Sequence, residues 1–171
     1  MERLVTLGAV DAGEVLTLQR AAYVSEAQAH GDLDLPPLRQ TLAELLAELG
    51  HPTVLGLGWR DDRSGRLLAA VRATLATSDA TIADIGRLTV VPDRQGQRLG
   101  SRLLAALEQR LPSSVTVLRL FTGEHSHANL RLYHRLGYSE TARTLTGGGY
   151  HLVHLSKARV TQSCEPPGPV S

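Results

Sequence analysis

The sequence predicts one domain of the mixed α/β class, and three observations support this. The chain has 171 residues, of which 42% are hydrophobic, which is enough for one packed core at an ordinary domain size. Some segments carry apolar residues at the spacing of amphipathic helices, and others are short β-branched runs bounded by turn residues. No internal repeat or linker divides these segments, so we expect residues 1–157 to form a single domain.

Periodicity and helix-breaking residues predict the elements of the first half. Asp11 precedes a run that is apolar on one side, as at the start of a helix, and Gly50 stops a second, leucine-rich helix. The polar segment between them holds Gly31 and two prolines, which predicts a loop. Turn-forming residues at 61–65 separate two apolar runs and predict a hairpin. The expected elements are a strand at 4–9, helices at 11–23 and 38–50 around a loop at 25–37, and strands at 53–59 and 66–77.

The second half alternates strands with helices. A β-branched run stops at Pro92, and leucines at helical spacing continue from there to Pro112. Three consecutive glycines at 147–149 form a turn before the last strand. The expected elements are strands at 81–91, 114–121, 138–145 and 150–155, with helices from about Gln97 to Leu111 and at 126–136.

Composition excludes several function classes. Eighteen basic and seventeen acidic residues leave a net charge of +1, and there is no long Lys/Arg run, so nucleic acid is not an expected partner. No apolar stretch reaches the ~18 residues of a membrane span, and the first residues lack a signal-peptide pattern. The chain is therefore expected to be cytoplasmic, without a membrane partner.

The last residues differ from the rest of the chain. Residues 161–171 are rich in Ser, Pro and Gly, which predicts that 158–171 form a disordered tail. The single cysteine, Cys164, lies there and is interpreted as incidental. One cysteine also excludes an intramolecular disulfide and a cysteine-based metal site.

Residues 85–104 contain the most informative pattern in the chain. An apolar strand ends at Pro92, a glycine-containing loop follows, and an amphipathic helix begins directly after it. This order directs free backbone N–H groups and the positive end of a helix toward one point, which favours a phosphate group. Neither the nucleoside-triphosphate loop nor the dinucleotide fingerprint is present.

This segment resembles motif A of the GNAT superfamily, the acyl-coenzyme-A-dependent N-acetyltransferases. That motif reads Q/R-x-x-G-x-G/A, and residues 95–100 read Q-G-Q-R-L-G after a strand that ends L-T-V-V-P. Gln95 and Gly100 match the ends of the motif, whereas Arg98 stands where the family usually has glycine. We expect Arg98 to adopt helical backbone angles in the first turn and to place a positive charge beside the phosphates.

A second stretch, residues 120–138, resembles motif B of the same superfamily. Its helix should carry N-x-x-L-Y-x-x-x-G-[FY], which this chain matches at Asn129, Leu132, Tyr133, Gly137 and Tyr138. The longer pattern F-T-G-x-x-S-x-x-N-L-x-L-Y resembles an uncharacterised bacterial subgroup. The resemblance implies the GNAT fold, a mixed and mostly antiparallel sheet of about six to seven strands with helices on both faces.

The resemblance also implies acetyl-coenzyme A as co-substrate and a cleft between two splayed parallel strands, here 87–91 and 117–122. The backbone N–H groups of Leu88 and Val90 are assigned to the pantetheine arm and the oxyanion. Tyr133 matches the tyrosine that protonates the leaving sulfur, and Asn129 lies one turn before it on the same face. The implied cofactor-binding residues are Leu88, Thr89, Val90, Gln95, Gly96, Gln97, Arg98, Leu99, Gly100, Ser101, Asn129 and Tyr133.

The general base is less well defined by the sequence. Glu26 and Glu124 are the preferred candidates, and Asp84, His125 and His127 are further ones, although each could instead be a solvated surface residue. The family also dispenses with a dedicated base where the amine has a low pKa. No metal is expected, because the two neighbouring histidines lack further ligands at suitable spacing.

The acceptor pocket is expected from residues 26–37 and 147–149. Its acidic residues favour a cationic small-molecule amine, although an acidic loop can also serve solubility alone. Two alternatives remain: a coenzyme-A-binding sensor or scaffold without turnover, which Arg98 favours, and an acyltransferase with another acyl donor or a protein acceptor. A homodimer is predicted through the last two strands and Trp59.

Overall fold

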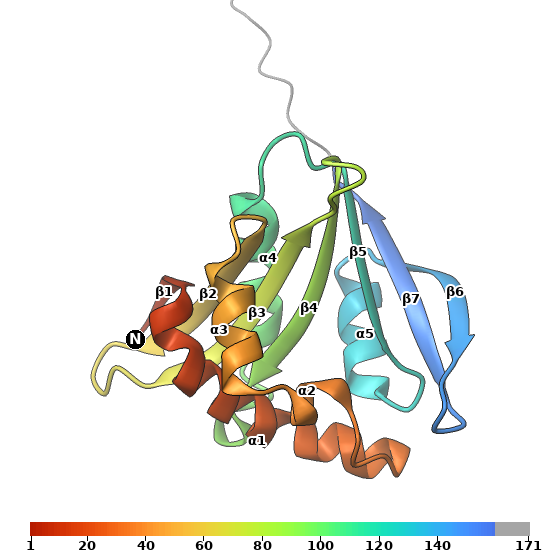
Figure 1. The fold of residues 1–171 in the computed structure, drawn as a ribbon, viewed down its shortest axis with the longest axis horizontal. Coiled ribbons are helices and arrows are strands. Elements are labelled where there is room, and N and C mark those ends of the chain that lie inside the picture. Colours follow the sequence, from red (N-terminus) through yellow and green to blue (C-terminus); the bar gives the residue numbers. More distant parts are fainter. Residues whose placement is uncertain (160–171) are drawn as a thin grey trace, which may run out of the picture.

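The computed structural model describes residues 1–159 and confirms the predicted fold class (Figure 1). Within these residues the strands form one seven-stranded sheet in the order β1-β2-β3-β4-β5-β7-β6. The elements are β1 (Glu2–Leu7), α1 (Ala12–His30), α2 (Pro36–Arg39), α3 (Leu42–Gly50), β2 (Val54–Asp61), β3 (Leu67–Leu75), β4 (Ile82–Val90), α4 (Leu99–Arg110), β5 (Val117–Gly123), α5 (His127–Arg135), β6 (Ser139–Leu145) and β7 (His151–Ala158), with short 3-10 turns at Ala9–Asp11 and Pro92–Arg94.

The sheet separates at its one parallel pair of strands. All other neighbouring strands are antiparallel, whereas β4 and β5 run parallel. They pair only at Ile82↔Val117, Ala83↔Leu118 and Asp84↔Arg119. Beyond these pairs the two strands diverge and leave a wedge between them (Figure 1). The predicted splay of two parallel strands is therefore present.

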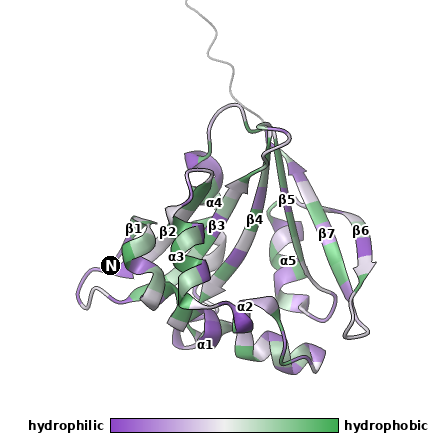
Figure 2. Cartoon of the chain, viewed as in Figure 1, coloured by the Kyte–Doolittle hydropathy of each residue, from purple (hydrophilic) through white to green (hydrophobic). Residues whose placement is uncertain are grey.

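The core lies between the sheet and its helices. Helices α1 and α3 pack on one face of β2–β4, and α4 packs on the other. Hydrophobic residues are concentrated on the central strands and on the helix sides that face them (Figure 2). In α4 the buried residues are Leu99, Leu103, Leu104 and Leu107, which are the leucines whose spacing predicted the helix.

The expected loop at 25–37 is partly wrong, because α1 continues through it to His30. Residues 26–29 are Glu, Ala, Gln and Ala, which favour helix, and the buried Ala27 holds this turn against the domain. The helix ends where Gly31 adopts a left-handed conformation with φ 61°. The predicted stop was therefore placed two turns too early.

The expected helix at 38–50 is divided in two. Gln40 leaves the helical conformation after α2, and Thr41 then caps α3 by accepting a hydrogen bond from the Glu44 N–H, while the Glu44 side chain accepts one from the Thr41 N–H. This reciprocal capping fixes a new helix start.

At the other end of the chain, β7 runs one residue into the predicted tail, and the rest of that tail, with Cys164, lies outside the described residues.

Candidate active site

A cavity of about 1010 Å³ occupies the wedge between β4 and β5. One end is formed by the loop before α4, the other by α1, the segment after it and the β6–β7 turn. Side chains of α5 line the wall between them. This arrangement brings motifs A and B, which are far apart in the sequence, into one cavity.

The loop before α4 has the open backbone that a phosphate site needs. Gly96 adopts a left-handed conformation with φ 76°, and a side chain there would point into open space. Gly100 lies in the first turn of α4, where an added Cβ would contact Val90 at 3.6 Å and Leu88 at 3.8 Å. The helix begins at Leu99 rather than near Gln97.

The expected helical conformation of Arg98 is wrong. Arg98 is the N-cap of α4 and has φ 61° and ψ 13°, in the left-handed region. Such a conformation costs a non-glycine residue about 1–2 kcal/mol. The loop therefore keeps the turn for which relatives use glycine, and it also carries an exposed guanidinium at the cavity edge.

The Val90 N–H faces the wedge. The Val91 N–H donates to the Leu68 carbonyl of β3 at 2.9 Å. Because backbone groups alternate along a strand, the Val90 N–H points away from β3. Leu88 lies in the register irregularity of β4, and its N–H remains assigned to the wedge from the motif alone. The β4–β5 pairs end at Asp84, so no strand covers this part of β4 on the side of β5. Donors in this position are suited to an amide chain or a developing oxyanion.

Most of the predicted cofactor-binding residues line the cavity. Those that do are Leu88, Thr89, Val90, Gln95, Gly96, Arg98, Leu99, Gly100, Ser101, Asn129 and Tyr133. Gln97 does not, and its side chain accepts a hydrogen bond from the Arg94 Nε at 2.8 Å. Arg98 and Arg135 line this end and form no ion pair with another described residue.

Tyr133 contributes a buried phenol to the cavity wall. It is the one buried residue of α5, and within residues 1–159 its hydroxyl has no hydrogen-bond partner. Burial, and then the nearby Tyr23 and Glu26, raise the pKa of Tyr133 well above its usual value of 10. The phenol is therefore protonated at neutral pH and can donate a proton to an anionic group in the cavity.

Glu26 connects α1 to the start of α5. Its carboxylate accepts hydrogen bonds from the Ser126 hydroxyl and, at 3.3 Å, from the Asn129 side-chain amide. The Asn129 amide is thus directed toward Glu26 and not toward the Tyr133 hydroxyl. Glu26 lines the cavity with about a quarter of its side chain exposed. Of the predicted bases, it is the one that the structure brings to the cavity.

The other candidate bases lie elsewhere. Glu124 does not line the cavity. Its carboxylate accepts a hydrogen bond from the backbone N–H of His151 at 2.6 Å and another from the imidazole ring of His151. These bonds lower the pKa of Glu124 below its usual value, which makes it a weaker base. Asp84 is bound by the Arg119 guanidinium at 2.8 and 2.9 Å. His125 and His127 are exposed and are not part of the cavity lining.

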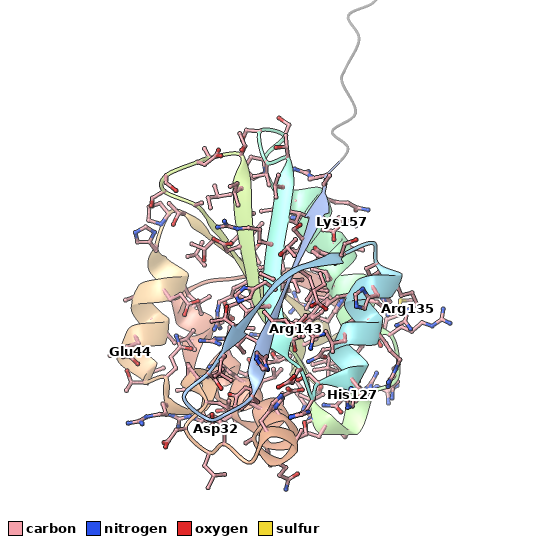
Figure 3. All side chains as sticks on the ribbon, turned by 90° about the vertical axis from the view of Figure 1, so that its right-hand side faces the viewer. Asp32, Glu44, His127, Arg135, Arg143 and Lys157 are labelled. Atoms are coloured by element: carbon pink, nitrogen blue, oxygen red, sulfur yellow. The ribbon has the colours of Figure 1, made fainter. Side chains whose placement is uncertain are left out.

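The far end of the cavity is held together by His30. Its Nε2 accepts a hydrogen bond from the His125 N–H at 3.2 Å, so Nδ1 carries the proton and donates to the Glu26 carbonyl at 2.9 Å. The ring lies against Gly123, where any side chain would overlap it. The Tyr150 hydroxyl donates to Asp32 at 3.0 Å, and Figure 3 shows Asp32 beside the turn of the β6–β7 hairpin.

The sequence analysis did not single out Tyr23 or the Arg87 side chain as lining residues, whereas His30 lies in the segment 26–37 that it expected at the acceptor pocket. A signal existed for Tyr23: residues 23, 26, 27 and 30 follow the helical spacing i, i+3, i+4, i+7, which continues the stripe of α1. Arg87 has no such signal, because its place depends on an irregularity in β4.

Two further findings concern the described part of the chain. Within residues 1–159, no group of three or more His, Cys, Asp or Glu side chains is arranged to hold a metal ion. In the same residues, no helix combines the length and the apolar composition needed to cross a bilayer.

Comparison with known proteins identifies the family. Residues 15–138 match the model of the Acetyltransferase (GNAT) family. This match spans most of the chain, including both motifs and the cavity between them, and the chain therefore belongs to the GNAT family of acetyltransferases, which use acetyl-coenzyme A or coenzyme A. No curated protein matches the chain in sequence.

Solved structures show the same fold. A ribosomal-protein alanine N-acetyltransferase from Escherichia coli superposes with a TM-score of 0.74 at 19% identity, covering 92% of this chain and 94% of its own. A GNAT-family acetyltransferase from Streptococcus pneumoniae gives 0.72 at 15% identity, covering 93% and 100%. The PaiA N-acetyltransferase from Thermoplasma acidophilum, in complex with coenzyme A, gives 0.71 at 16% identity, covering 90% and 98%.

Proposed function

We propose that the protein transfers an acetyl group from acetyl-coenzyme A to the primary amine of a small molecule by direct attack. The observation that carries this proposal is the single cavity with two chemically different ends. One end offers backbone donors and free guanidinium groups, and the other offers carboxylates, with the Tyr133 hydroxyl in the wall of the same cavity.

The cofactor end fits coenzyme A. The loop around Gly96 is open, and the start of α4 and the exposed Arg98 and Arg135 provide positive charge for phosphates. The Val90 N–H faces the wedge, where the amide-bearing pantetheine arm would extend, and the Leu88 N–H is assigned there from the motif. The free backbone donors suit that arm because each amide carbonyl needs a donor once it leaves water.

The reaction requires three actions of this chain. Glu26 takes a proton from the ammonium group, directly or through water, so that the neutral nitrogen attacks the thioester carbonyl. The Leu88 or Val90 N–H stabilises the negative charge that develops on the carbonyl oxygen. As the C–S bond breaks, the Tyr133 hydroxyl protonates the leaving thiolate. The resulting phenolate takes up the second proton of the attacking nitrogen, directly or through water, and Glu26 releases its proton to solvent. Glu124 acts in this scheme only by fixing the start of β7.

One observation favours a second candidate, a coenzyme-A-binding sensor or scaffold without turnover. Arg98 holds a strained conformation where relatives have glycine, and such a change can weaken cofactor binding. The same cavity is also compatible with another acyl donor or with a protein acceptor. Membership of the bacterial subgroup described above likewise remains a proposal. The protonated Tyr133 and the accessible Glu26 favour turnover over a sensor.

A thiol-release assay tests the proposal. Purified protein is incubated with acetyl-coenzyme A and a panel of primary amines, and free thiol is followed with and without each amine. We expect amine-dependent release and an acetylated product by mass spectrometry. Tight coenzyme A binding by calorimetry, with no thiol release in the presence of any amine or peptide, would favour the sensor instead. Thiol release only from a longer acyl-coenzyme A would show that the acyl group is not acetyl.

A homodimer remains a proposal, with weaker support than the sequence suggested. Trp59 is half-buried and packs against the core, with the Arg102 guanidinium 4.7 Å from its ring centre. The other predicted contact, the edge strand β6, is exposed at every residue and could pair with a second copy. Light scattering at micromolar concentration would decide, because a mass of ~18 kDa excludes the dimer.

A further inference from the structure

Arg87 has an unusual backbone conformation. Among the described non-glycine residues, only Arg87 and Arg98 have positive φ, and Arg87 has φ 57°. Both line the cavity, Arg98 at the cofactor end and Arg87 at the acceptor end. Strained residues of this kind persist where the surrounding structure holds them, and they are concentrated at binding sites.

A bulge in β4 accounts for the position of Arg87. Ala70 pairs with Thr89 and Arg72 pairs with Gly86, so β4 has one more residue than β3 between these two pairs. Arg87 lies in this bulge. A bulge redirects a side chain that would otherwise follow the alternation of the strand. Here it places an arginine at the border of the main cavity and of a shallow neighbouring hollow formed by α2 and the start of α3.

The Arg87 guanidinium has no carboxylate partner. Within residues 1–159 it forms no ion pair, and neither do Arg98 and Arg135 at the cofactor end, whereas Arg94 pairs with Glu2. Its neighbour is the Tyr23 hydroxyl, whose pKa burial raises and Arg87 partly lowers again. Tyr23 also lies within electrostatic reach of Glu26. A half-buried, unpaired cation therefore lines the same cavity as the carboxylate that is proposed to receive the amine.

We propose that the acceptor is an amine that also carries a carboxylate, an amino acid in the broad sense, and that Arg87 binds this carboxylate. The proposal rests on the proposed function, because it assigns the acceptor of the same cavity. The acidic side chains Glu26, Asp32 and Asp34 suit the ammonium group. Arg87 supplies the opposite charge at the same end, and a guanidinium can bind a carboxylate through two hydrogen bonds.

The test compares each amino acid with its own carboxamide. The thiol-release assay is run with the common L-amino acids, β-alanine and 4-aminobutanoate, each paired with the amide that keeps the amine and loses the negative charge. We expect the best acceptors to be amino acids. In Arg87→Gln, the preference of kcat/KM for the acid over the amide should fall about 10- to 100-fold, because a charge-assisted hydrogen bond is lost.

Matched variants and a second measurement make the result decisive. Arg63→Gln removes the same charge from the exposed β2–β3 turn and should leave the preference unchanged. Arg87→Gly removes the side chain and relieves the positive φ, so a loss of preference in this variant cannot be attributed to misfolding. Calorimetry with N-acetyl amino acids and their amides, in the presence of coenzyme A, measures the same preference without turnover.

The outcomes separate this inference from the proposed function. Turnover of amines with no preference for the acid, or a preference that survives in Arg87→Gln, overturns the inference and leaves the acetyltransferase intact. No turnover with any amine overturns the proposed function. In that case the acceptor assignment falls with it, and carboxylate binding by Arg87 stands only if N-acetyl amino acids bind wild type more tightly than their amides and lose this difference in Arg87→Gln.

Discussion

The two ends of the cavity are built from different parts of the chain. The cofactor end depends on backbone: the Leu88 and Val90 N–H groups, the turn at Gly96 and the start of α4. The acceptor end depends on side chains, chiefly Glu26 and Arg87 with the acidic residues after α1. A backbone site constrains few residue identities, whereas a side-chain site can change by single substitutions. The family therefore identifies the donor more readily than the acceptor.

The most severe test of this comparison is Tyr133→Phe, which removes the acid assigned to the leaving thiolate, in the cavity wall between the two ends. Turnover should fall about 10²- to 10⁴-fold, because the leaving thiolate loses its acid. Coenzyme A affinity should be nearly unchanged, since the ring still packs. Because the pKa of Tyr133 is raised, the phenol stays protonated, and wild-type turnover should not decline on this account below about pH 10. Steady-state kinetics measures turnover, and calorimetry measures the affinity for coenzyme A. Turnover within a few-fold of wild type would show that Tyr133 is a core residue and not the acid.

Gly100→Glu tests the cofactor end alone. The carboxylate would lie near the phosphates in the first turn of α4, and the Kd for coenzyme A should rise about 10- to 100-fold. Gly100→Ala is the matched control. An added Cβ meets its nearest neighbour at 3.6 Å, which is ordinary contact, so alanine should bind coenzyme A as wild type does. An equal loss in both variants would indicate a steric effect, and no loss in either would move the phosphate site elsewhere.

Glu26→Gln tests the acceptor end alone. The amide removes the charge and the proton acceptor. Its one oxygen can still accept a hydrogen bond from Asn129, and its –NH2 group can donate one to the Ser126 hydroxyl, so the junction of α1 and α5 should persist. We expect kcat/KM for the amine to fall about 10-fold or more, with the Kd for coenzyme A unchanged. Glu124→Gln, the matched change outside the cavity, should leave the kinetics as in wild type. If Glu124→Gln lowered kcat/KM and Glu26→Gln did not, Glu124 and not Glu26 would be the base.

Arg98→Gly separates the charge of the motif A loop from its conformation. Glycine adopts positive φ freely, so unfolding free energy should increase by about 1 kcal/mol. Loss of the guanidinium should weaken coenzyme A binding a few-fold. Gly96→Ala provides the opposite case, because its φ of 76° is strained for alanine in open space, and it should destabilise the fold. If Arg98→Gly binds coenzyme A more tightly, the arginine does not contact the phosphates.

The smallest effect concerns the pH dependence of Glu124. Hydrogen bonds from His151 lower its pKa from the usual 4.5, so its contribution to stability is present above that pH and is lost as the pH falls through the lowered value. The melting temperature of Glu124→Gln should therefore lie below that of wild type at neutral pH. The two should converge in acid. A constant difference across this range would show that the charge is not responsible.

The sequence predicted the cofactor end better than the acceptor end. Glycines, prolines and the order strand–loop–helix are local signals, and they located the wedge, the loop and Tyr133. The acceptor end depends on contacts between distant residues, such as Glu26 with Asn129 and Asp32 with Tyr150. Periodicity within one segment does not indicate such pairs.

The errors have related physical causes. Gly31 and two prolines led to a loop assignment, although only residues after His30 leave the helix, because tertiary packing of Ala27 outweighs the nearby breakers. Arg98 was assigned helical angles because the helix was expected to begin near Gln97, which would place Arg98 in its first turn, whereas α4 begins at Leu99. The loop imposes its conformation on whichever residue occupies that position, and no pattern in a single sequence reveals the strain.

The short β4–β5 register has a consequence for the edges of the sheet. Strand edges with free N–H and C=O groups usually lie at the rim, where they invite pairing with other chains and lead to aggregation. In this molecule the divergence after Asp84 creates two further edges inside the sheet, under the cover of α5 and the loop before α4. These internal edges can accept an extended, amide-bearing ligand much as a sheet accepts an added strand.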